Sequence, residues 1–268
     1  MIEQADVIAV LGVRNESMVL PHTLRRLISE RIPFAVLDNE SSDGTRELVL
    51  SEEFRPWLMS LTSLPFSGSF NLAEQLAAKE GLISTLKADW VIHLDADEVL
   101  QSPVAGEGLL DAIARVDRAG YNVINFDEFV FLPTEVAFDC SAQGFQPMLS
   151  YYFFEPAPHR LMRAWKRSTG FSGRDSGGHR LSGEGIQVLP QNFNLRHYIF
   201  RDQRHAFSKY ANRVFAEDDL ARGWHGNRVN QPQERFRFPL ADELEHLAWP
   251  GSAAFSRSRP RQTHFWQW

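Results

Sequence analysis

The fold is decided by residues 89–100, Asp-Trp-Val-Ile-His-Leu-Asp-Ala-Asp-Glu-Val-Leu. The first half of this stretch is mostly apolar and contains β-branched residues, which favour strands, so a buried strand is predicted over 89–94. The second half carries three carboxylates within four residues. In an extended segment, side chains two positions apart point the same way, so Asp95 and Asp97 are expected to share one target.

A shared target for two carboxylates has to carry positive charge, because like charges brought together repel. A divalent cation bound to a diphosphate fits, since Mg²⁺ and Mn²⁺ prefer oxygen ligands. Open α/β sheets also bind ligands beyond the carboxyl ends of their strands. Asp95 and Asp97 are therefore predicted to lie in such a site, and the alternative is a solvated acidic turn.

Strands and helices alternate upstream of this stretch. Residues 6–13, 33–38 and 58–64 read as strands, and apolar stripes at helical spacing lie between them, such as Leu20, Leu24, Leu27 and Ile28. Four such alternations in the first 100 residues predict an α/β fold with a mostly parallel central sheet wound with helices.

The pattern becomes less regular after residue 100. Strands are expected at 121–126, 159–165 and 194–200, and a glycine-rich loop spans 170–185. A short helix is expected to cover residues 240–247. Internal repeats and linkers are not recognisable, so we predict one domain over 1–268.

Composition narrows the class of protein. The 268 residues are 43% hydrophobic and 23% charged, as in ordinary soluble domains. The net charge of −6 argues against a nucleic-acid partner. Cys140 is the only cysteine, and the sequence shows neither a signal-peptide pattern nor an apolar run that could span a membrane. A cytoplasmic protein is expected.

Three segments follow predicted strands in order: Val13–Glu16, Leu37–Thr45 and Leu94–Glu98. Together they resemble the family-2 glycosyltransferases with the GT-A fold, and the second is close to that family's Asp-X-X-Ser-X-Asp-Gly-Thr element. The resemblance covers roughly the first 100 residues. Residues 177–179 and 195–198 look like a bacterial subgroup of the same family.

The resemblance implies a GT-A-like domain with a Rossmann-like nucleotide-binding half. Residues 1–100 would bind the nucleotide sugar, residues 101–230 would form the acceptor and catalytic half, and residues 231–268 would be a C-terminal helix and tail. The implied activity is metal-dependent transfer of a sugar, with inversion, from a nucleotide-diphosphate sugar to an acceptor hydroxyl. A UDP-sugar is the expected donor, Mn²⁺ or Mg²⁺ the cofactor, and a carbohydrate, lipid or protein the acceptor.

Site residues also follow from the resemblance. Asp38 would hold the base or ribose, Asp95 would face the ribose and the metal, and Asp97 would bind the metal that bridges the phosphates. The segment Arg14, Asn15 and Glu16 would lie along the nucleotide cleft. A divalent ion there would neutralise the charge that develops on the departing diphosphate.

An inverting transferase also needs a base to accept the proton of the acceptor hydroxyl. Many family members carry a Glu-Asp pair at the start of a helix after the glycine-rich region. The triplet Glu217-Asp218-Asp219 is expected at the end of a helix, where the helix dipole disfavours acids, and reads as solvated surface. Asp175 and Glu184 remain as candidate bases, and Asp175 is preferred because it is near Gly177-Gly178-His179.

Two histidines are candidate site residues. His197 lies in a predicted strand, where a buried imidazole needs a polar partner, and a metal ion would be one. We therefore predict His197 as a metal ligand and His179 as a contact to phosphate or acceptor.

Two other functions remain open. A sugar-phosphate nucleotidyltransferase has a similar sheet, but it needs a glycine-rich basic loop after the first strand, which residues 11–15 do not supply. A catalytically degenerate GT-A domain that binds only nucleotide or a protein partner is the other alternative, because the family's Glu-Asp pair is not recognisable.

Overall fold

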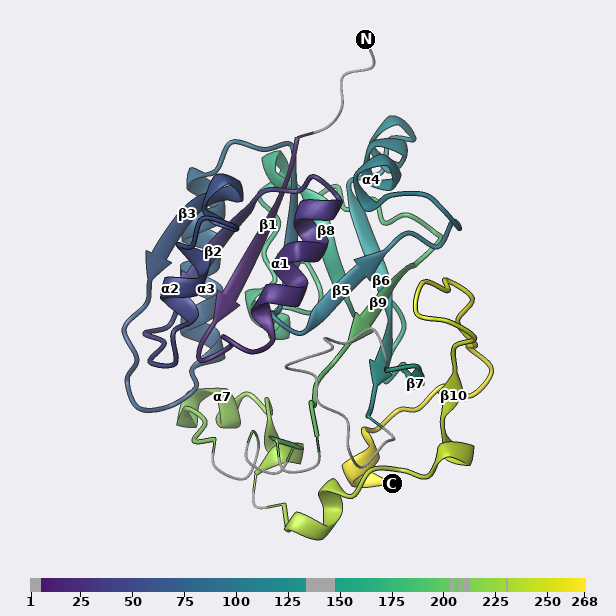
Figure 1. Cartoon of the computed structure of the whole chain (residues 1–268). Coiled ribbons are helices and arrows are strands. Elements are labelled where there is room, and N and C mark those ends of the chain that lie inside the picture. The colour runs from purple at the N-terminus through teal and green to yellow at the C-terminus, as the bar shows by residue number, and fades with distance from the viewer. Residues whose placement is uncertain (1–5, 134–147, 203–204, 207–208, 210–212, 230) are drawn as a thin grey trace.

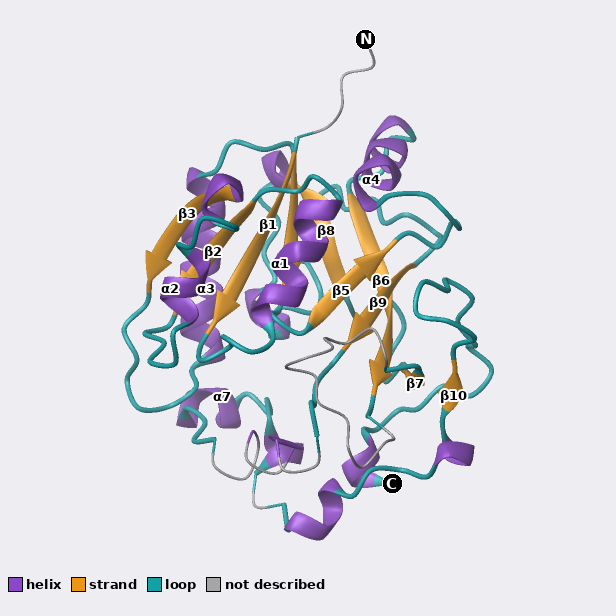
Figure 2. Cartoon of the chain, viewed as in Figure 1, coloured by secondary structure: helices purple, strands orange, loops and turns teal. Residues whose placement is uncertain are grey.

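The computed structural model describes residues 6–133, 148–202, 205–206, 209, 213–229 and 231–268. Figure 1 shows the chain by residue number and Figure 2 by type of element. The helices and strands are, in order, β1 (Val7–Val13), α1 (Leu20–Ser29), β2 (Phe34–Asp38), α2 (Thr45–Val49), β3 (Leu58–Ser63), α3 (Leu72–Thr85), β4 (Trp90–Leu94), β5 (Glu98–Gln101), α4 (Leu109–Arg118), β6 (Val123–Phe131), β7 (Ser150–Phe154), β8 (Met162–Lys166), β9 (Phe193–His197), α7 (Glu217–Ala221) and β10 (Glu245–His246).

The predicted α/β fold with a mostly parallel central sheet is confirmed. The main path of the sheet runs β10-β7-β6-β8-β4-β1-β2-β3. Strands β1 to β4 are parallel to one another, and β8 lies antiparallel between β4 and β6. Because β8 is antiparallel to both of its neighbours, β6 runs in the same direction as β4 and β1. Strand β9, which is parallel to β6, also runs in this direction.

Alternation along β1 explains how the helices cover the sheet. Val7, Ala9 and Leu11 pack in one core cluster with residues of α1 and α4, whereas Ile8 and Val10 pack in another with residues of α3. Successive side chains of a strand point to opposite faces, so both faces of this central strand are buried.

The strand register brings three loops to one edge of the sheet. Val13 lies opposite Asp38, and Leu11 lies opposite Leu94. The segments after β1, β2 and β4 therefore begin side by side, at the lower end of the strands in Figure 1. This is the edge where the sequence predicts a ligand site.

The extended conformation expected for Asp95 and Asp97 is wrong. The strand ends at Leu94, Ala96 and Asp97 form a turn, and a new strand starts at Glu98. The turn lets the chain leave β1 and pair with β9 instead. Glu98 stabilises it, because one carboxylate oxygen accepts a hydrogen bond from the amide of Asp95 at 3.0 Å. The two aspartates therefore point to different partners.

The helix expected over residues 240–247 is also wrong. Residues 241–243 form one 3₁₀ turn, and β10 follows as a two-residue strand on the edge of β7. The amide of Leu247 continues this pairing with the carbonyl of Leu149 at 2.9 Å, so the backbone bonds to the sheet and not to itself. Among the described residues, the helices are too short or too polar to cross a bilayer.

Candidate active site

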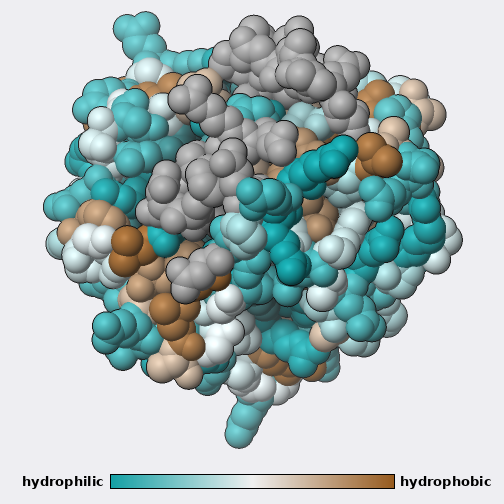
Figure 3. Space-filling view, turned by 90° about the horizontal axis from the view of Figure 1, so that it is seen from below, coloured by the Kyte–Doolittle hydropathy of each residue, from teal (hydrophilic) through white to brown (hydrophobic). Residues whose placement is uncertain are grey.

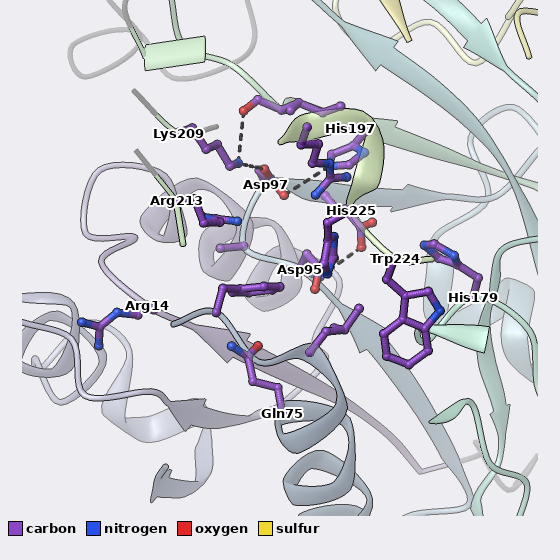
Figure 4. A pocket seen from close by; sticks show the side chains of 18 of the residues that line it. Arg14, Gln75, Asp95, Asp97, His179, His197, Lys209, Arg213, Trp224 and His225 are labelled. Carbon is purple, nitrogen blue, oxygen red and sulfur yellow. Dashed lines mark hydrogen bonds and ion pairs between the residues drawn. The ribbon is translucent and has the colours of Figure 1, made fainter. Parts of the chain in front are cut away.

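A cavity of about 870 Å³ lies at the carboxyl ends of the parallel strands. Figure 3 views this end of the molecule, where hydrophilic residues form much of the described surface. In Figure 4, Asp95 and Asp97 lie between Arg14 and Gln75 on one side and His179 and Trp224 on the other. The described lining includes eight basic residues: Arg14, Lys79, Arg160, Arg163, Arg201, Lys209, Arg213 and Arg228. It includes five acidic ones: Glu16, Asp95, Asp97, Glu98 and Glu128. The cavity is therefore basic in a chain whose net charge is −6.

Arg14, Asn15 and Glu16 line the cavity, as the sequence predicts. Side chains hold this loop against the loop after β2. Arg14 donates to the carbonyls of Asn39 and Glu40 and stacks its guanidinium 3.3 Å from the ring centre of Phe66. The Asn15 side chain accepts from the amide of Ser42 at 2.8 Å. These bonds fix the backbone, so the loop is preorganised.

Asp38 has a structural role in this state. It is 2% exposed, accepts a hydrogen bond from the amide of Ser41 at 3.1 Å, and is not among the residues that line the cavity. Its contact with a base or ribose remains a prediction.

Asp95 belongs to a network of charges on the cavity floor, in which its own side chain is 46% exposed and its partners Lys79 and Arg163 are buried. Its two oxygens lie 3.5 Å from Lys79 Nζ and 3.3 Å from Arg163 Nη2. Lys79 reaches across β1 from α3, and its Nζ is 2.7 Å from Nε2 of His93. Enclosure by protein opposes ionisation of Asp95, yet Lys79 and Arg163 hold its pKa below the usual range. Burial lowers the pKa of Lys79, and Asp95 offsets part of that shift.

Gly12 makes room for Lys79. A Cβ at position 12 would lie 2.6 Å from Lys79 Cε and 3.3 Å from Nζ. Such distances are shorter than van der Waals contact. A larger residue at position 12 would therefore push the amine of Lys79 away from Asp95. The sequence offered no reason to single out Lys79, which reads there as an ordinary helix residue.

Asp97 and His197 form a second group. His197 Nε2 lies 3.4 Å from one oxygen of Asp97, and Lys209 Nζ lies 2.8 Å from the other. On the opposite side of the ring, His197 Nδ1 is 2.6 Å from Glu128, which also pairs with Arg160. Burial opposes protonation of His197, but Asp97 and Glu128 raise its pKa well above the usual value.

The donor chemistry of this group fits a divalent ion in part. Glu128 fixes His197 through Nδ1 and directs Nε2 toward Asp97, which is how carboxylates orient metal-binding histidines. However, no cluster of three or more His, Cys, Asp or Glu side chains suited to a metal occurs in the described ranges. Asp95 is thus not grouped with Asp97 and His197. The protein would supply two ligands, and phosphate oxygens or water would have to complete the shell.

Glu16 differs from the other cavity carboxylates. Burial, with a contribution from nearby Asp97 and Asp95, raises its pKa to about 7, while Lys209 and Arg213 oppose the shift. Its backbone amide donates to Thr45 Oγ1 at 2.8 Å, which fixes where the side chain begins. A carboxyl group with a pKa near neutrality can exchange a proton at physiological pH.

The two predicted base candidates lie elsewhere. Asp175 and Glu184 are exposed and are not among the cavity-lining residues. The glycine-rich loop folds back on itself through the pairing of Ser172 with Ser182, so only part of it reaches the cavity. That part includes Gly177 and His179. His179 thus lies where a ligand contact is possible, whereas the positions of Asp175 and Glu184 do not support a role as base.

The acidic triplet at 217–219 is neither the end of a helix nor wholly solvated. It begins α7, and Asp219 is completely buried. The carboxylate of Asp219 accepts hydrogen bonds from the amides of Leu72 at 2.6 Å and Ala73 at 3.2 Å. It therefore caps the start of α3, the helix that carries Lys79.

Comparison with known proteins gives distant structural matches only. No protein-family model and no curated protein matches the chain. A crystal structure of S. aureus TarS 1-349 is 15% identical, with a TM-score of 0.47 over 72% of this chain. The match spans 60% of that TarS chain. Other TarS structures contain UDP or UDP-GlcNAc.

Two further matches are complexes with Mn²⁺. The mannosyltransferase PcManGT from Pyrobaculum calidifontis, bound to GDP-Man, is 15% identical with a TM-score of 0.36, over 69% of this chain and 57% of that one. Glucosyl-3-phosphoglycerate synthase from Mycobacterium tuberculosis is 16% identical with a TM-score of 0.38, over 77% of each chain. At these scores the likeness assigns no activity, so function is argued from the site.

Proposed function

We propose that this protein is a family-2-like glycosyltransferase. It would transfer a sugar, with inversion, from a nucleotide-diphosphate sugar to an acceptor hydroxyl. One observation carries the proposal: the loop after β1, the Asp95–Asp97 turn after β4 and His197 of β9 converge on one basic cavity. A UDP-sugar is the proposed donor, and a carbohydrate, lipid or protein the acceptor.

Each group has a part in this reaction. Arg14 and Asn15 hold the loop that would receive the nucleotide, and Lys79 keeps Asp95 ionised toward the ribose. Asp97 and His197 would hold Mn²⁺ or Mg²⁺, which neutralises charge on the departing diphosphate when bound. Arg213 and Lys209 add positive charge on the same side of the cavity, where phosphates would lie.

Binding and hydrolysis test the proposal together. UDP with Mn²⁺ should bind the full chain in calorimetry, and one of a panel of nucleotide sugars should be hydrolysed slowly to UDP. The matched variant His197→Phe keeps a ring of similar size on β9 but lacks nitrogen ligands. It should weaken UDP binding in Mn²⁺ and not in EDTA. Absence of UDP binding by the unaltered protein would refute the proposal.

A nucleotide-binding domain without catalysis is the second candidate. The position of Asp175 and Glu184 outside the cavity lining favours it, because an inverting transfer needs a base near the acceptor. UDP binding without hydrolysis or transfer for any donor would support this candidate over the enzyme.

A further inference from the structure

The side of the cavity away from the β1 loop is a separate wall, built partly by the last residues of the chain. A series of contacts leads to it from Asp97: through His197 to Glu128, and from Glu128 to Arg160. The guanidinium of Arg160 then lies 4.8 Å from the ring centre of Phe154. Beyond Phe154 comes His264, whose ring stacks on it at 3.8 Å.

Backbone hydrogen bonds attach the segment that carries His264 to the sheet. Arg261 pairs with the edge of β7, donating to the carbonyl of Phe153 at 2.8 Å and accepting from the amide of Glu155 at 2.9 Å. His264 is then 7% exposed between Phe154 and Trp266, and its Nδ1 is 2.8 Å from the hydroxyl of Tyr152. His264 lines the cavity, and because its Nδ1 is engaged by Tyr152, a ligand there would have to use Nε2.

The same segment positions a second arginine. Trp266 donates through Nε1 to the carbonyl of Asn227 at 3.1 Å, and Gln267 accepts from the side chain of Asn227 at 3.2 Å. These bonds hold the turn Gly226–Arg228 against the cavity, which both Asn227 and Arg228 line. Three segments distant in sequence therefore contribute Arg160, Arg228 and His264 to one wall.

The described side chains of this wall carry more positive than negative charge: Arg160, Arg228 and His197 against Glu128. Its carboxylate, Glu128, already pairs with both His197 and Arg160. Burial is the main reason that the pKa of His264 falls well below its usual value, and Arg228 and Arg160 add to the effect, so both cations act on the ring. Guanidinium groups in a confined site bind carboxylates and phosphates through paired hydrogen bonds.

We propose that this wall binds the acceptor, and that the acceptor carries a carboxylate or phosphate close to its reactive hydroxyl. The inference rests on the proposed function, since it assigns the opposite side of the cavity to the donor. Arg160 and Arg228 would bind the anionic group, and neutral His264 would hydrogen-bond to it or to a neighbouring hydroxyl.

A calorimetric comparison of three sugars tests the inference. The full chain is saturated with UDP and Mn²⁺ and titrated with glucuronic acid, glucose 6-phosphate and neutral methyl glucoside. At least one anionic sugar should bind about tenfold or more tightly than the neutral one, as expected for a charge-assisted pair. Comparing the first two distinguishes a carboxylate from a phosphate.

Variants assign the effect to the wall. Arg228→Gln should reduce the preference for the anionic sugar by about tenfold. His264→Phe, which retains the stacking, should weaken the same sugar while UDP still binds. Arg25→Gln is the matched control, because Arg25 is exposed and pairs with Glu53 away from the cavity.

The outcomes separate the two proposals. Failure of UDP to bind refutes the proposed function and this inference with it. If UDP binds but the three sugars bind with equal affinity, or none of them binds, the acceptor wall alone is refuted. A preference that survives Arg228→Gln and His264→Phe also refutes it.

Discussion

The two sides of the cavity are built by different means. On the β1 side, parallel strands in register place short loops together, and hydrogen bonds between side chains of one loop and the backbone of the next fix their shape. On the far side, the tail at 261–268 pairs its backbone with β7 only at Arg261, and its side chains then contact β7 and the turn at 226–228. The first side depends on a regular local pattern, whereas the second depends on contacts between distant segments.

This difference teaches where functional information lies in the chain. Regular strand–loop units reveal themselves through periodicity, so their ends can be located in advance. A wall assembled from single residues of distant segments has no period. Variants on either side can show whether the two sides serve the donor and the acceptor separately.

The largest effect is expected from Asp97→Asn. Asp97 is 7% exposed and contacts His197 and Lys209, so the amide keeps the shape but loses the charge. UDP affinity in Mn²⁺ should fall by about 100-fold or more, because loss of an outer partner of a metal ligand alone costs 10- to 100-fold. Calorimetry measures it, with exposed Asp218→Asn as the control. Unchanged affinity would remove Asp97 from the site.

A smaller effect is expected from Lys79→Met and Gly12→Ala. The first removes the cation beside Asp95, and the second places a Cβ 2.6 Å from Lys79 Cε without touching a ligand group itself. Both should weaken UDP binding by about tenfold, the usual size of a lost charge-assisted contact.

Gly81→Ala, on the helix α3 that carries Lys79, is the matched control for Gly12→Ala on β1, because a Cβ at position 81 meets nothing within 4 Å. If Gly12→Ala binds UDP as the unaltered protein does, Lys79 does not act on the donor side.

Glu16→Gln should change stability in a pH-dependent way. The folded pKa of Glu16, about 7, is above its ordinary value, so ionising this group disfavours the folded state. The stability that the neutral Glu16 side chain contributes is fully present below the pKa of Glu16 in the unfolded chain. It is lost as the pH rises through about 7. In EDTA, the Gln variant should melt higher than the unaltered protein at pH 8, and at nearly the same temperature below the ordinary pKa of 4.5. Equal melting temperatures at pH 8 would contradict the shift.

The smallest effect is expected from Asp175→Asn and Glu184→Gln. Both side chains are exposed away from the cavity lining, so donor hydrolysis or transfer should stay within about twofold of the unaltered rate, as for ordinary surface changes. A loss of about 100-fold in either variant, the size of general-base catalysis, would return that residue to the site.

The strand ends on the β1 side of the cavity could be predicted from sequence. The strand ends at Val13, Asp38 and Leu94 follow from apolar runs that stop at polar residues, and the parallel register then places them together. The break after Leu94 was not predictable, because the change of partner from β1 to β9 depends on a strand about 100 positions later.

The cavity residues that were not predicted from the sequence share one property. Lys79, Glu128 and Arg163 are charged residues inside regular elements, and each is buried because its partner comes from another element. Only Glu128 carried a local signal, as one of two adjacent acids in a strand whose other residues, except Asn125, are apolar. Burial of a charge depends on the three-dimensional pairing, which a single sequence does not reveal.

The cap that Asp219 provides has a consequence for how the protein folds. It joins residues 147 positions apart, so α3 lacks acceptors for two of its first amides until the distal segment docks. Closing so long a loop is slow compared with forming a helix. Hydrogen exchange at Leu72 and Ala73 should therefore gain protection later in refolding than exchange in the middle of α3. The start of α3 would then report on the docking of the distant half of the chain.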